Sequence, residues 1–119
     1  MSNKPRIALF LGGTSPEREV SKSSGASIYK TIIALGYETV LIDPAYGKNQ
    51  PDKPEDFFNK EDFSELSTKN YLDACNLPSL KNVELVFLAL HGKYGEDGTI
   101  QSLLELKGLK YTGSKVLSS

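Results

Sequence analysis

The sequence predicts an α/β domain of three layers, with a short, mostly parallel sheet of about four strands. Two apolar segments, Ile7–Leu11 and Leu85–Leu90, have the length and composition of strands buried on both faces of a parallel sheet. A segment with the apolar spacing of a helix follows each of them. Short links between such elements favour parallel pairing through right-handed crossovers. The 119 residues amount to one domain at most.

Composition and charge indicate an ordinary folded protein. Of the residues, 39% are apolar and 24% are charged, as in globular domains rather than disordered chains. The net charge is −1 without a basic block, so nothing indicates a nucleic acid or a membrane surface as a partner. Cys75 is the only cysteine, which excludes a disulfide framework and a thiolate metal site. No apolar run approaches the ~20 residues of a membrane span or the length of a signal-peptide core, so we expect a cytoplasmic protein.

The first strand leads into a glycine turn. Gly12 and Gly13 follow it directly, and because glycine has no Cβ, the backbone there can approach another group closely. In a doubly wound sheet the first strand is central, and the loop at its carboxyl end faces the ligand crevice. Tyr37–Ile42 is the predicted second strand, ended by Asp43 and a proline.

A helix is predicted between these two strands, from about Pro16–Ser21 to Leu35. Thr14 with Glu17, or Ser15 before a proline, would cap its start. Apolar and small residues recur at helical spacing along it, namely Val20, Ser24, Ala26, Ile28, Ile32 and Leu35.

Residues 45–82 are polar and interrupted by prolines at their start, so we expect a surface insertion. Within it, Phe63–Leu66 alternates as a short strand does, and Lys69–Cys75 suits one or two helical turns. The third strand is predicted at Val83–Leu90 and the fourth at Leu109–Thr112. A helix between them would start at Asp97 or Thr99 as its N-cap and bury Ile100, Leu103 and Leu104.

Two charged or titratable residues stand at the predicted crevice, and each has a purely structural alternative. Glu17 is a candidate partner for a substrate ammonium, but a carboxylate in the first turn of a helix is stabilising without any ligand. His91 ends a buried strand at the same sheet edge and is the only histidine, although it could simply donate to a backbone carbonyl. Neither the dinucleotide glycine fingerprint nor the phosphate-binding P-loop is present.

Two motifs allow a more specific inference than the spacing of their residues alone. LGGTSPEREVSKSSG at Leu11–Gly25 and LALHGKYGEDGTIQSLLELKGLKYTGS at Leu88–Ser114 together closely resemble the amino-terminal domain of D-alanine–D-alanine ligase, an ATP-grasp ligase of peptidoglycan synthesis. The resemblance covers nearly the whole chain except residues 45–82. It implies a Rossmann-like, pre-ATP-grasp fold for 1–119 as the substrate-binding domain.

The resemblance also implies roles for individual residues. In that family the glutamate matching Glu17 binds the ammonium of the first D-alanine, and the valine matching Val20 lines the pocket for its methyl group. Ser21 would lie beside that pocket at the start of the helix. The histidine matching His91 lies near the reacting carboxyl and phosphate, which makes Glu17 and His91 the candidate catalytic residues.

The family uses ATP and Mg²⁺ to form an acyl phosphate on the first D-alanine, which the amine of the second D-alanine then attacks. The ATP-grasp domains that hold nucleotide and metal follow the amino-terminal domain, so we expect 119 residues to be inactive alone and to bind neither. The resemblance further implies a homodimer for the complete enzyme. Gly12 and Gly13 remain candidate backbone contacts to substrate.

The sequence leaves two alternatives to a ligase that joins two D-alanines. A ligase that uses D-lactate or D-serine as its second substrate would share this domain, because the residues that choose the second substrate lie mostly beyond Ser119 in the family. A stand-alone small-molecule binding module could also keep the pocket without the chemistry.

Overall fold

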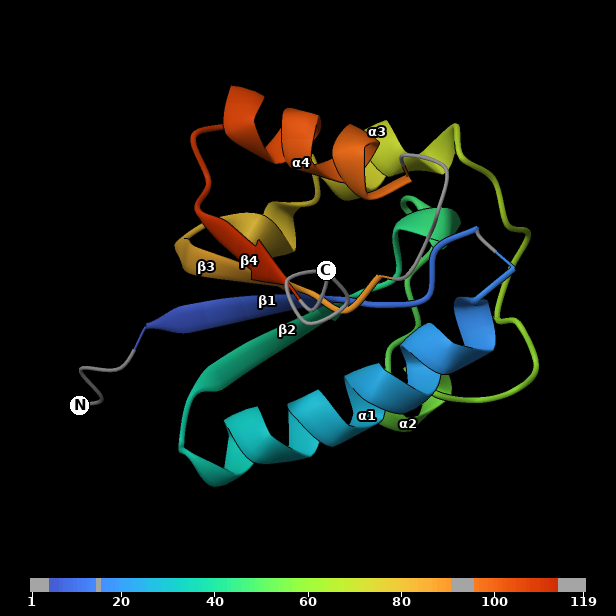
Figure 1. Cartoon of the computed structure of the whole chain (residues 1–119), viewed down its shortest axis with the longest axis horizontal. Coiled ribbons are helices and arrows are strands. Elements are labelled where there is room, and N and C mark those ends of the chain that lie inside the picture. The colour runs from blue at the N-terminus through green and yellow to red at the C-terminus, as the bar shows by residue number, and fades with distance from the viewer. Residues whose placement is uncertain (1–4, 15, 91–95, 114–119) are drawn as a thin grey trace.

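A computed structural model gives the structure of the chain and describes residues 5–14, 16–90 and 96–113 (Figure 1). The strands are β1 (Arg6–Phe10), β2 (Glu38–Ile42), β3 (Val83–Leu88) and β4 (Tyr111–Gly113). The α-helices are α1 (Arg18–Ala34), α2 (Pro54–Phe57), α3 (Asn70–Ala74) and α4 (Glu96–Leu106), and the two 3₁₀ turns are η1 (Pro44–Tyr46) and η2 (Pro78–Leu80). No helix among the described residues is long and apolar enough to cross a membrane.

The four strands form one sheet in the order β2-β1-β3-β4, and every neighbouring pair is parallel. This confirms the predicted fold class. Leu9 of β1 is paired with Leu41 on one side and with Phe87 on the other, so β1 is flanked on both edges. The loop that leaves β1 therefore emerges between the ends of β2 and β3, where parallel sheets bind their ligands.

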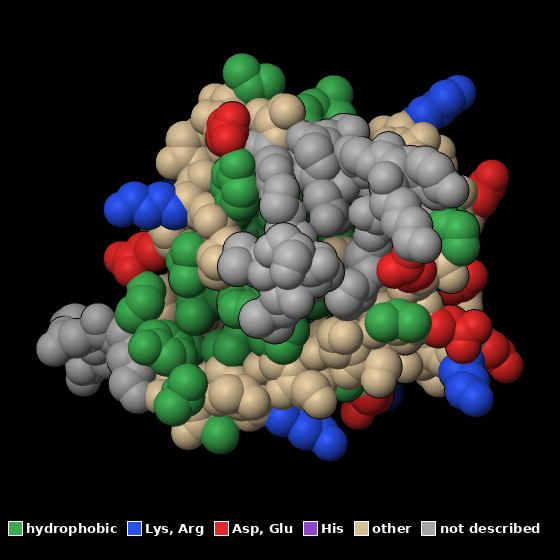
Figure 2. All heavy atoms as spheres, viewed as in Figure 1, with side chains coloured by type: hydrophobic (Ala, Val, Ile, Leu, Met, Phe, Trp, Pro, Cys, Tyr) green, Lys and Arg blue, Asp and Glu red, His purple; other side chains and the backbone are tan. Residues whose placement is uncertain are grey.

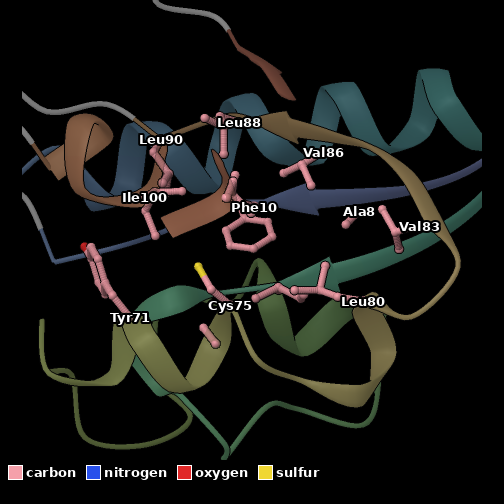
Figure 3. Close-up of a cluster of buried hydrophobic side chains, with 13 residues drawn as sticks. Ala8, Phe10, Tyr71, Cys75, Leu80, Val83, Val86, Leu88, Leu90 and Ile100 are labelled. Carbon is pink, nitrogen blue, oxygen red and sulfur yellow. The ribbon is translucent and has the colours of Figure 1, made fainter. Parts of the chain in front are cut away.

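Alternate residues of the strands enter two separate cores, one on each face of the sheet. Phe10, Val86 and Leu88 point to the face that α3 and α4 cover (Figure 3). Leu9 and Leu41 point to the opposite face, where they pack with residues of α1 and α2. In Figure 1 these helices lie above and below the sheet, which gives the three predicted layers.

Helix α1 starts at Arg18, within the predicted range, but its buried face matches the predicted stripe only in part. Its N-cap residue is Glu17, which makes no side-chain capping hydrogen bond, so the predicted cap at Thr14 is wrong; Ser15 lies outside the described residues. Val20 and Leu35 from the helical-spacing stripe are 53% and 55% exposed. The buried positions of α1 are Arg18, Ser21, Lys22, Gly25 and Ile32, of which only Ile32 belongs to the predicted stripe. Polar side chains occupy them because partners from other elements satisfy those polar groups.

Residues 45–82, predicted as a surface insertion, contribute to both cores as well as to the surface. Asp52 and Lys60 are exposed, whereas Phe57 and Tyr71 are 4% and 2% exposed. The segment packs on the sheet because it connects β2 to β3, which lie on opposite sides of β1. The strand predicted at Phe63–Leu66 does not form, while α3 confirms the helical turn predicted at Lys69–Cys75.

The last unit follows the predicted pattern with shifted bounds. Helix α4 begins at Glu96, so Asp97 and Thr99 lie inside its first turn and the predicted N-cap is wrong. Ile100 and Leu104 are fully buried, as predicted. Strand β3 ends at Leu88, two residues before its predicted end, and β4 begins at Tyr111, two residues after its predicted start.

The α1 side of β3 is incompletely covered. An apolar groove of about 450 Å³ lies there between α1 and the strands, with Ile7, Ile32 and Phe87 among its lining residues. Figure 2 shows hydrophobic side chains gathered on the lower left of the molecule, near the carboxyl-terminal end of α1. Apolar surface of this extent often marks a contact with another protein segment.

Candidate functional site

The candidate site is the turn between β1 and α1, at the edge of the sheet where β1, β2 and β3 end. Gly12 and Gly13 have φ angles of 84° and 78°, in the left-handed region that favours glycine. Both glycines are buried. The chain therefore reverses direction beneath the surface and then enters α1 at Arg18.

Three successive N–H groups of the turn each donate to a side-chain oxygen from a different element. The N–H of Gly12 donates to Ser21 Oγ of α1 at 2.8 Å, and that of Gly13 donates to Asp43 Oδ1, just after β2, at 3.1 Å. The N–H of Thr14 donates to the hydroxyl of Tyr71 in α3 at 3.0 Å. The turn is thus hydrogen-bonded to α1, to the residue that follows β2, and to α3 in the segment 45–82. These glycine N–H groups are engaged within the chain, so they are not available as donors to a substrate in this structure.

Arg18 lies at the centre of the hydrogen bonds beneath the turn. Its Nη1 donates to the carbonyl oxygen of Gly13 at 2.7 Å, and its Nη2 lies 2.8 Å from Asp43 Oδ2. Nη2 also donates to the hydroxyl of Tyr46 at 2.9 Å, and Nε donates to Asp62 Oδ1 at 3.0 Å. The guanidinium lies 5.1 Å from the centroid of the Tyr46 ring. One side chain therefore joins the turn, the end of β2 and the segment 45–82.

The Arg18–Asp43 pair is buried, with side chains 10% and 0% exposed. Burial raises the pKa of the Asp43 carboxyl, and hydrogen bonds from Arg18 and from the N–H groups of Gly13 and Ala45 oppose that rise. Burial alone would lower the pKa of Arg18, but its bonds to Asp43 and Asp62 outweigh this effect and raise it. The pair is consequently stable only as a unit, because each buried charge depends on the other for its compensation.

Gly12 lies directly against this ion pair. A Cβ atom at Gly12 would lie 2.2 Å from Asp43 Oδ2 and 2.8 Å from Arg18 Nη1. The close approach predicted from the two glycines is therefore real, but at Gly12 the approaching group is the protein's own ion pair. The missing Cβ makes room for the carboxylate that holds the turn.

Ser21 is buried beneath the same turn, with an exposed fraction of 0%. Its hydroxyl donates to the carbonyl oxygen of Ala89 at 2.5 Å while it accepts the N–H of Gly12. Ala89 follows β3, so this hydroxyl connects the β1 turn to the end of the next strand. The structure thus places Ser21 next to the turn but uses its hydroxyl for internal bonds.

Glu17 and Val20 lie at the start of α1, above this buried layer. Glu17 is half-buried and Val20 is 53% exposed. Val20 follows Glu17 by three residues, the spacing at which two residues lie on the same side of a helix. His91 lies outside the described residues. The structure therefore brings together Glu17, Val20, Ser21, Gly12 and Gly13 among the predicted site residues.

Sequence reasoning missed the polar residues that hold the turn. They are Arg18, Asp43, Tyr46, Asp62 and Tyr71. A signal was present for one of them, because Asp43 directly follows a buried strand at the ligand edge of the sheet. The described residues contain no group of three or more His, Cys, Asp or Glu side chains that could hold a metal ion.

Asp62 connects the segment 45–82 to α1, and its ionisation predicts a pH dependence of stability. It accepts from Arg18 Nε and from Lys22 Nζ, at 3.0 and 3.3 Å. Partial burial alone would raise the pKa of Asp62, but the bonds and charges of Arg18 and Lys22 outweigh it and lower the pKa. Ionised Asp62 therefore stabilises the fold above the unfolded pKa of about 4, and this contribution is lost as the pH falls through the lower folded pKa.

We expect Asp62→Asn to reduce the free energy of unfolding at pH 7 and to have progressively less effect below about pH 4. Urea unfolding of both proteins across this pH range measures the difference. Asp52→Asn is the control, because Asp52 is exposed and forms no ion pair with any described residue. The same pH dependence in both variants would contradict the assignment.

Comparison with known proteins identifies similar chains. Residues 6–114 match a family described as "D-ala D-ala ligase N-terminus". The D-alanine–D-alanine ligase of Desulforamulus reducens is 42% identical over 115 residues, which cover 96% of this chain and 28% of that protein. The ligase of Geotalea uraniireducens is 38% identical over 114 residues, with coverage of 96% and 28%. The chain thus spans less than a third of the length of these relatives.

Solved structures show the same likeness. The D-alanine–D-alanine ligase from Bacillus anthracis, complexed with ATP, aligns with a TM-score of 0.55 and 32% identity over 93% of this chain and 28% of that one. VanG, a D-Ala:D-Ser ligase from Enterococcus faecalis, aligns with a TM-score of 0.61 and 25% identity over 92% of this chain and 35% of that one. The predicted resemblance is thereby confirmed at the level of sequence and fold.

Proposed function

Because the chain belongs to the family of D-alanine–D-alanine ligase amino-terminal domains, we propose that it binds the first D-alanine for a ligase that joins two D-alanines. In this proposal residues 1–119 are the substrate-binding domain, and ATP-grasp domains elsewhere in the complete protein supply the nucleotide site. The product would be D-alanyl-D-alanine for peptidoglycan synthesis.

One observation carries this proposal: the half-buried Glu17 and the half-exposed Val20 lie three residues apart at the start of α1, directly after a turn that buried side chains hold. D-Alanine carries its ammonium group and its methyl group on the same carbon atom, Cα. A carboxylate is the natural partner of the ammonium through charge-assisted hydrogen bonds. The isopropyl group of Val20 can remove the methyl group from water. The two side chains therefore match the two ends of this small amino acid that do not react in the first step.

The remaining predicted site residues take supporting roles in the proposal. His91 would lie near the reacting carboxylate, as the family resemblance implies. We assign Ser21 to holding the turn, since its hydroxyl already bonds to Gly12 and Ala89. Gly12 has the same role, because it admits the Asp43 carboxylate.

ATP and Mg²⁺ belong to the complete ligase in this proposal. The described residues offer no cluster for a metal ion, and the sequence has no phosphate-binding glycine motif, so no step is assigned to either group on this chain. ATP bound elsewhere in the enzyme would supply the phosphoryl group that activates the first D-alanine. We also infer a cytoplasmic homodimer for the complete enzyme, in keeping with the family.

Calorimetric titration of D-alanine into this chain tests the proposal, with L-alanine as the stereochemical control. We expect D-alanine to bind and Glu17→Gln to weaken binding by at least about tenfold, because a charge-assisted hydrogen bond contributes about 1.5–3 kcal/mol. Glu19→Gln is the matched control, since Glu19 is exposed on the same turn of α1. Equal binding of both enantiomers, or unchanged binding by Glu17→Gln, would contradict the proposal.

A ligase that joins D-alanine to D-serine is the second candidate, because the VanG D-Ala:D-Ser ligase shares this fold at 25% identity. Both candidates need the same first-substrate pocket. Assaying the complete protein with D-alanine alone and then with added D-serine or D-lactate separates them by the dipeptide or depsipeptide formed. A stand-alone binding module would bind D-alanine but form none of these products.

A further inference from the structure

The ring of Tyr71 packs in the core, and its hydroxyl forms a hydrogen bond in the candidate site. It lies on α3, is 2% exposed and packs in the cluster that contains Phe10, Leu88 and Ile100. Figure 3 shows its oxygen directed away from the other labelled side chains. That oxygen accepts the N–H of Thr14 at 3.0 Å and lies 3.1 Å from Thr14 Oγ1. The two residues are 57 positions apart in the sequence.

The Thr14 N–H needs such a partner because of where the turn takes the chain. Gly13 has a φ angle of 78°, so the backbone has left the sheet, and α1 does not begin until Arg18. A partly buried N–H without a hydrogen bond costs free energy. Ser21 and Asp43 satisfy the two preceding N–H groups, and Tyr71 completes the series from a segment outside the β1–α1–β2 unit.

We propose that Tyr71 is a positioning residue for the first D-alanine, acting through Thr14 on the placement of Glu17; this inference rests on the proposed function. Thr14 is three residues before Glu17, and Pro16 stiffens the link between them. Without the hydroxyl, we expect Thr14, and through it Glu17, to occupy additional conformations. The apparent affinity for D-alanine then falls by the fraction of molecules that keep Glu17 in its binding position.

Tyr71→Phe in the complete ligase tests this inference, because it removes one oxygen and keeps the ring. We expect the KM for the first D-alanine to rise about five- to tenfold, the loss expected for one hydrogen bond, with kcat changed less than about twofold. Leu80→Val is the control. Leu80 is buried in the same cluster, and none of the hydrogen bonds among the described residues joins it to the turn. It should lower the melting temperature and leave the KM unchanged.

Amide hydrogen exchange of Thr14 gives a second measurement that does not depend on activity. We expect exchange at Thr14 to become faster in Tyr71→Phe and to stay unchanged in Leu80→Val. An unchanged exchange rate in Tyr71→Phe, or an unchanged KM in a variant of an active ligase, overturns the inference. A wild-type complete protein without D-alanine-dependent phosphate release overturns the proposed function instead, so the two failures are distinguishable.

Discussion

Replacing Asp43 with alanine is expected to lower the free energy of unfolding by about 3–5 kcal/mol, because it leaves the Arg18 guanidinium buried without its partner. Asp43 is fully buried and also accepts the N–H groups of Gly13 and Ala45, which would lose their acceptor. Urea unfolding of the wild-type chain and the variant measures this difference. Single domains are stable by only about 5–15 kcal/mol, so a loss of this size can unfold the alanine variant. Asp43→Asn is a milder variant for that case, because it keeps the shape of the side chain.

Two controls separate burial from charge. Glu38→Ala removes the carboxylate that lies 3.6 Å from Arg6 Nε, in a pair whose Arg6 side chain is 31% exposed and whose Glu38 side chain is 71% exposed. Surface pairs contribute about 0–1 kcal/mol, so this variant should remain close to the wild type. The double variant Arg18→Met with Asp43→Leu should recover part of the loss, because no unpaired charge remains. A loss below about 1 kcal/mol in Asp43→Ala would contradict the view that this pair holds the turn.

Gly12→Ala is expected to have the second large effect, with a loss above about 3 kcal/mol. Two costs combine at this position. The φ angle of 84° is unfavourable for alanine, and the new Cβ would lie 2.2 Å from Asp43 Oδ2. The carboxylate cannot move away without breaking its bond to Arg18, so the chain must distort.

Gly108→Ala separates these two costs. Gly108 has a φ angle of 74°, but a Cβ there would meet nothing within 4 Å. We expect a loss of about 1–2 kcal/mol from backbone strain alone. Thermal and urea unfolding of the two variants give the contribution of the steric conflict as their difference. Similar losses in both would show that the ion pair tolerates a side chain at Gly12.

Both predictions concern the same property of the site: the turn between β1 and α1 is held by buried side chains. Ser21, Asp43 and Tyr71 bind three consecutive N–H groups, and Arg18 binds a carbonyl oxygen of the same turn. In the proposed function, Glu17 is placed by this buried layer before any substrate arrives. Preorganisation of this kind reduces the ordering cost of binding a small ligand.

Helices, strands and the ligand edge of the sheet could be predicted from the sequence, because their signals are local. Apolar runs predicted β1 and β3, and helical spacing predicted α1. Those signals depend on neighbouring residues within one element. The motif around Glu17 likewise indicated the family through residues that stand next to one another in the chain.

Tertiary structure alone decided which side chains of that motif face inward. Helical spacing predicted that Val20 shares a face with Ile32, yet Val20 is exposed and Arg18 is buried. A buried arginine needs an anionic partner, and Asp43 is 25 residues away in the sequence. Tyr71 is farther still from Thr14. Spacing along one chain carries no information about such pairs, because only the parallel sheet and its crossovers bring their elements to the same turn.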